Sequence, residues 1–163
     1  MPNAYPPNNQ IRLTASFSTL ASTSLSAAVT SLVQTTLTVS SAVGFPAAGT
    51  YLVQVDAEVM TVTAGQGSTT WTVSRGVSPT VHDAGAAVTA SVATAADPTA
   101  VTLAIKDPAG AKTAPSPVKD SVGNYHYDYT PTLPGQYGYA FAGTGAVVAQ
   151  VEGTFFVTPS VVS

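Results

Sequence analysis

Apolar and polar residues alternate one by one in short runs along this chain, and turn residues separate the runs. The run IRLTASF at residues 11–17 is the clearest, because every second residue in it is apolar. A period of two places one apolar face on a β-strand and does not fit a helix. Similar runs occupy residues 36–40, 51–55, 58–63, 69–74, 87–92, 101–106, 136–142 and 146–157. Turn signals recur about every 8–12 residues, as in small sandwiches and barrels, so the sequence predicts an all-β protein.

Two segments lack this clear alternation. Residues 1–10 contain three prolines and three asparagines, which predicts an extended N-terminal arm without a core of its own. Residues 20–33 carry apolar side chains at mixed spacing, so a short helix and a loose strand both remain open there. That stretch is broken by Ser and Thr and is too short to span a bilayer, and no secretory signal precedes it, so no membrane association is expected.

Charge is scarce in this sequence. Only 8% of the residues are charged, against about 25% in an ordinary soluble domain. With 45% hydrophobic residues the chain is expected to fold, and a surface this poor in charge is expected to be covered partly by neighbouring subunits. The net charge is −3 and the five cations form no cluster, which argues against nucleic acid as a partner. The chain has no cysteine, so disulfides and thiolate chemistry are excluded.

The ionisable residues give no assembled catalytic pattern. Asp56 and Glu58 are a possible carboxylate pair, but a hairpin turn is expected between them and no third acid is near in sequence. His82-Asp83 supplies only half of a metal-ligand set, and His82 is expected to fix its loop by hydrogen bonds to the backbone. No nucleophile elbow, phosphate loop or zinc motif is present. We therefore predict no enzyme activity and no cofactor or metal.

A tyrosine-rich run near the C-terminus also alternates. Its three tyrosines, at 125, 127 and 129, alternate with His126 and Asp128. Period-two spacing puts the tyrosines on one face of a strand, where we expect them to pack in a core, and His126 with Asp128 on the other. Two possible ligands without partners are too few for a metal site.

Residues 35–88 resemble a small β module that recurs in tail, baseplate and other virion proteins of tailed phages. The marks of the resemblance are Gly44-Phe45-Pro46, Glu58 before an apolar strand, a strand containing Trp71, Arg75-Gly76, and His82 three residues before Gly85. Glu58 and Arg75 both belong to this pattern, so the resemblance implies that they form a hydrogen-bonded structural ion pair. It implies no catalytic role for them.

Residues 97–157 are similar to the immunoglobulin-like domain of phage structural proteins, especially those of actinobacterial phages. In such domains a strand like residues 11–17 leads through a short loop into the Asp-Pro-Thr segment, whereas here residues 18–95 stand between them. This favours insertion of the first module into an immunoglobulin-like β-sandwich after its first strand, since long insertions are tolerated where loop ends are close. Two tandem domains are the alternative. The expected parts are an arm at 1–10, a sandwich at 11–18 and 96–158, an inserted β-barrel or sandwich module at 19–95, and a tail at 159–163.

The resemblance implies a virion structural protein, most specifically a capsid decoration or cement protein made in the host cytoplasm and displayed on the capsid surface. Its partners would be the major capsid protein and neighbouring copies of itself, as in a trimer at local three-fold axes. The arm, with Asn3 and Tyr5, would lie across a neighbour. One alternative is a tail, baseplate or head–tail joining protein. Another is a carbohydrate-binding adhesion module that presents Trp71 and Tyr51 as an aromatic platform.

Overall fold

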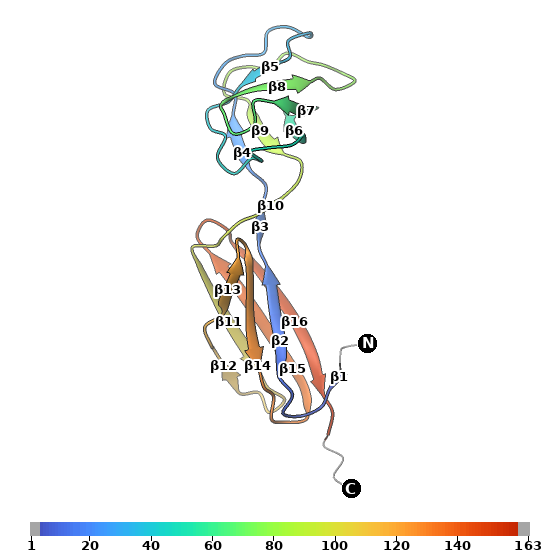
Figure 1. Cartoon of the computed structure of the whole chain (residues 1–163), viewed down its shortest axis with the longest axis vertical. Coiled ribbons are helices and arrows are strands. Elements are labelled where there is room, and N and C mark those ends of the chain that lie inside the picture. Colours follow the sequence, from blue (N-terminus) through green and yellow to red (C-terminus); the bar gives the residue numbers. More distant parts are fainter. Residues whose placement is uncertain (1–3, 160–163) are drawn as a thin grey trace. The chain divides into compact units, whose positions relative to one another are not determined.

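The computed structural model describes residues 4–159 and is all-β, with no helix among these residues. The chain divides into two compact units, each with its own hydrophobic core (Figure 1). Unit 1 takes the chain up to Ser18 and again from Ala95, and unit 2 is Thr19–Thr94. The division agrees with the bounds expected for an inserted module to within a residue.

Unit 1 is a sandwich of two sheets. The five-stranded sheet runs β1 (Ala4–Tyr5), β16 (Ala149–Val157), β15 (Gly135–Thr144), β11 (Ala100–Lys106) and β12 (Lys112–Thr113). The three-stranded sheet runs β13 (Val118–Ser121), β14 (Asn124–Tyr129) and β2 (Ile11–Ser16). Neighbouring strands are antiparallel except β1, which is parallel to β16. The alternating apolar residues of both sheets meet in one core.

The pairing of β2 bears directly on the insertion hypothesis. β2 pairs with β14 along its whole length, from Ile11 opposite Tyr129 to Ser16 opposite Asn124. Pairing with a strand of unit 2 would have contradicted insertion. Instead, the chain leaves unit 1 after β2, forms unit 2, and returns to complete the sandwich.

The strand order is that of an immunoglobulin-like sandwich. β2, β14 and β13 take the places of strands B, E and D, while β12, β11, β15 and β16 take those of C′, C, F and G. The insertion therefore lies in the connection between strands B and C. It follows the second strand of the sandwich, not the first, because the short β1 precedes β2.

The expectation of a free N-terminal arm is wrong for its described part. Ala4 and Tyr5 pair with Phe156 and Val157 of β16, and Asn8 donates its backbone N–H to Pro131. The ring of Tyr5 packs edge-on against Phe155, with 6.1 Å between ring centroids. The segment is extended, as predicted, but it satisfies its backbone on the open edge of β16 and adds an aromatic ring to the core.

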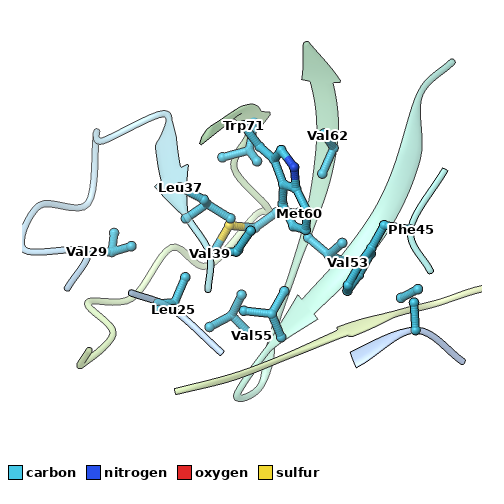
Figure 2. Close-up of a cluster of buried hydrophobic side chains, with 14 residues drawn as sticks. Leu25, Val29, Leu37, Val39, Phe45, Val53, Val55, Met60, Val62 and Trp71 are labelled. Atoms are coloured by element: carbon cyan, nitrogen blue, oxygen red, sulfur yellow. The ribbon is translucent and has the colours of Figure 1, made fainter. Parts of the chain in front are cut away.

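Unit 2 is one curled six-stranded sheet. Its order is β4 (Ser22–Ser24), β9 (Ala87–Ala90), β6 (Tyr51–Val55), β7 (Glu58–Ala64), β8 (Thr70–Ser74) and β5 (Thr36–Thr38). The outer strands β4 and β5 also lie next to each other. An isolated bridge joins Leu25 to Val39, and backbone hydrogen bonds run from Ser26 to Thr38 and from Ser40 to Ser24. The curl removes open edges and encloses the core around Trp71, Met60 and Phe45 (Figure 2).

The segment at residues 20–33 contains strand and bridge pairing, which resolves the choice left open by its sequence. β4 pairs with β9, and Val29 bridges His82 further along. The connecting strands β3 (Ser18–Thr19) and β10 (Thr94–Ala95) pair with each other. The two ends of the insertion are therefore adjacent, as an insertion into a loop requires.

Candidate functional site

Asp56, Glu58, Arg75 and His82 meet in unit 2, and we call these four residues the ionic cluster. Arg75 donates from Nε and Nη2 to the two carboxylate oxygens of Glu58, both at 2.7 Å. Imidazole Nε2 of His82 lies 3.0 Å from Oε2 of Glu58, and Nδ1 lies 2.8 Å from Oδ2 of Asp56. The side chains of Glu58, Arg75 and His82 are 2%, 8% and 0% exposed. The structure thus brings together the predicted Glu58–Arg75 pair and adds two residues to it.

Local structure explains how these residues converge. Asp56 has a left-handed φ of 51° in the tight β6–β7 turn, which the sequence predicted at this place. Glu58 begins β7 and Arg75 follows β8 directly, so both lie at the same end of neighbouring strands. His82 arrives from the loop after β8, where its backbone N–H and C=O pair with Val29.

The electrostatics of the cluster favour an ionised Glu58. The bidentate hydrogen bonds from Arg75 lower the pKa of Glu58 to about 2, against the opposing effect of burial, and bonds from the Thr80 N–H and His82 add to the lowering. The same pairing raises the pKa of Arg75. Nε2 of His82 faces the ionised Glu58 carboxylate, and Nδ1 faces the carboxyl group of Asp56.

Arg75 also joins two loops. Its guanidinium donates to the backbone carbonyls of Ser31 and Gln34 in one loop and of Thr80 in the other. All five N–H groups of Arg75 and both carboxylate oxygens of Glu58 thereby form hydrogen bonds within unit 2. The cluster can hold the loops at 31–34 and 75–82 in place, while its member Asp56 keeps a side chain that is 58% exposed.

The prediction for His82 was wrong in its detail. We expected its side chain to fix the loop through backbone groups, whereas the ring lies between two carboxylates. The acidic partners come from 24 and 26 residues earlier in the chain, so local sequence did not reveal them. Within residues 4–159, no three His, Cys, Asp or Glu side chains are placed to hold a metal ion.

The second histidine, His126, lies on the three-stranded sheet of unit 1. His126 Nδ1 is 2.7 Å from Asp120, and Arg12 forms two bonds to Asp128 at 2.9 and 3.0 Å. The tyrosines of β14 pack against the core of unit 1, as predicted from their alternation. These side chains therefore pair across strands on the outer face of β2, β13 and β14.

The residues predicted to form a contact surface do not form one in the described structure. Trp71 is 0% exposed and donates its indole N–H to the Ser68 carbonyl at 2.7 Å. Tyr51 packs edge-on against it, and burial raises the pKa of Tyr51. The Trp71 ring lies within the core (Figure 2), and Tyr51 is partly buried and packs against that core, so they make no exposed platform for a sugar. Tyr5 is half-buried in unit 1, and Asn3 lies outside the described residues.

A groove that was not foreseen lies on the five-stranded sheet of unit 1. It has a volume of about 620 Å³ and its lining includes Ala104, Lys106, Lys112, Gly138 and Glu152. In the sequence, the glycines Gly138 and Gly153 and the alanines Ala104 and Ala140 occupy long strands in which bulkier residues are more usual.

No protein family, curated protein or solved structure matches the chain. The part of the chain that the structure describes forms no helix of the length and hydropathy needed to cross a membrane.

Proposed function

We propose that this chain is a non-enzymatic structural protein of a tailed-phage virion, where it acts as a capsid decoration or cement protein. It would work by contact with the major capsid protein and with neighbouring copies of itself. The resemblance of two segments to virion proteins motivates the proposal. The observation that carries it is that the ionic cluster is used to fix two loops whose apolar side chains remain in solvent.

These loops have the character of a contact surface. Leu32 and Val33 lie in the first loop, 53% and 84% exposed, and Val77 and Val81 lie in the second, 105% and 59% exposed. Arg75 bonds to the backbone of both loops. A loop that is already ordered loses little conformational entropy on binding, so apolar side chains on it favour association. Unit 2 would thus offer a pre-formed apolar contact to a protein shell.

The experiment is quantitative mass spectrometry of purified particles, with the major capsid protein as internal reference. A ratio near parity, or a simple fraction of it, is expected for a protein that covers the shell. Complete absence of the chain from particles would refute the virion proposal.

A tail, baseplate or head–tail joining role is the second candidate, because the module at residues 35–88 resembles one found in those assemblies. The same measurement separates the two roles. A handful of copies per particle would favour the tail or the portal vertex over the shell.

A further inference from the structure

The outer face of the five-stranded sheet carries unusually small side chains. Cross-strand pairing sets Lys106 beside Gly138 and Gly138 beside Thr154, and it sets Ala104 beside Ala140 and Ala140 beside Glu152. These residues alternate with the buried core residues of the same strands, so they face outward. A Cβ added at Gly138 would meet nothing within 4 Å. The middle strand β15 is therefore the floor of the groove.

The two rims of this groove carry opposite charges. Lys106 and Lys112 are direct cross-strand neighbours on one side, and Glu152 of β16 lies on the other. All three residues are exposed. The face is consequently positive along β11 and β12 and negative along β16.

These charges have no ionic partner within the described chain. Three of the five cations form ion pairs, Arg12 with Asp128, Arg75 with Glu58 and Lys119 with Asp97. The remaining two are Lys106 and Lys112. Like charges directly opposite on neighbouring strands are unfavourable, so this pair gains from an anion. Glu152 accepts a hydrogen bond from Gln150 and is in no salt bridge in residues 4–159.

The geometry points to a two-fold contact in which this face binds the same face of a second copy, with Lys106 and Lys112 of each copy against Glu152 of the other. A two-fold axis parallel to the strands places the β12 side of one sheet over the β16 side of its partner. The positive rim of each copy then meets the negative rim of the other, so the dimer contains two equivalent charge contacts. The small floor residues allow the two sheets to approach closely. The pairing is a dimer, in place of the trimer expected from the local three-fold symmetry of a shell.

The size of the face sets the strength of the contact. Three strands spaced about 4.8 Å apart, over some seven residues of about 3.3 Å each, together with the two residues of β12, cover roughly 360 Å² per copy. A stable complex buries about 800 Å² per partner, so the dimer should be weak in dilute solution and should weaken further as salt screens its charges. The inference deepens the proposed self-contact between copies, and on a shell the neighbouring copies would supply the high local concentration.

The test uses the full chain in sedimentation equilibrium at low salt, up to about 1 mM protein. The wild type should show a concentration-dependent dimer. Lys106→Glu with Lys112→Glu makes both rims negative, and Glu152→Lys makes both positive, so each variant alone should associate at least about tenfold more weakly. An equimolar mixture of the two variants should form a heterodimer, because every rim again meets its opposite.

Two controls make the result specific. Gly138→Gln fills the floor without touching the core and should also weaken the dimer, whereas Thr14→Glu on the other sheet should leave it unchanged. A wild type that stays monomeric throughout this range, or a dimer indifferent to the charge reversals, would overturn the inference. Because the assay contains no particle, its failure would leave the shell proposal standing.

Discussion

Replacing Glu58 by Gln should destabilise unit 2 strongly and leave unit 1 unchanged. The carboxylate accepts two bonds from Arg75 at 2.7 Å, one from the Thr80 N–H at 2.9 Å, and lies 3.0 Å from His82 Nε2. Glutamine keeps the shape but removes the charge. The Arg75 guanidinium, 8% exposed, would then be buried without a counter-ion. Breaking a buried pair in this way costs about 3–5 kcal/mol of unfolding free energy.

The pKa of Glu58 gives a consistent magnitude. It is about 2 in the folded protein, against an ordinary value of 4.5. A difference of this size corresponds to roughly 3 kcal/mol of stability. Because the pKa is lowered on folding, this stabilisation is complete above about pH 4.5 and is lost as the pH falls through about 2. The Glu58→Gln protein should lack this part of the acid dependence.

Trp71 gives an assay confined to unit 2. It is the only tryptophan in the chain and is 0% exposed, so its emission should shift to the red when this unit unfolds in urea. Asp128→Asn is the matched control, because Arg12 holds Asp128 with similar bidentate geometry but at 58% and 30% exposure. Such an exposed pair contributes about 1 kcal/mol or less, and it lies in unit 1. A Glu58→Gln transition within about 1 kcal/mol of wild type would refute the structural role of the cluster.

Three further outcomes are expected. Replacing residues 19–94 by a short glycine linker should leave unit 1 folded, because β3 and β10 bring its ends together; loss of the tyrosine near-ultraviolet dichroism would contradict an autonomous sandwich. Tyr5→Ala should destabilise unit 1 by about 1–2 kcal/mol, because the contact with Phe155 is lost. A change below about 0.5 kcal/mol would instead support the expectation of an N-terminal arm that does not pack on unit 1. Trp71 emission should not respond to cell-wall glycans, since the ring is buried; a saturable shift would revive the adhesion role.

The alternation in the sequence was sufficient to predict the all-β class and most strands. Where every second residue is apolar, as in β2, burial follows the pattern residue by residue. The tyrosines of β14 were placed correctly for the same reason. Trp71 alternates with Thr70 and Thr72, so its burial follows the same rule, and the idea of an exposed platform went against the pattern.

Other features depend on contacts between distant segments. β1 is only two residues long, and no alternation in a proline-rich stretch could reveal its pairing with β16 at the far end of the chain. His82 reaches two carboxylates because its loop folds back on the β6–β7 turn. The groove in unit 1 needs the register of three strands, which decides that Gly138 stands between Lys106 and Thr154. Register follows from the packed sheet and not from composition.

The most direct test of the account is the heat stability of particles that carry or lack this chain. The proposed cement role predicts that particles without the chain release their nucleic acid at a lower temperature. It also predicts that purified protein added back restores the wild-type value, because the proposed role is to bridge neighbouring capsomers. Particles whose release temperature is the same with and without the chain, although it occupies the shell, would contradict a stabilising structural role.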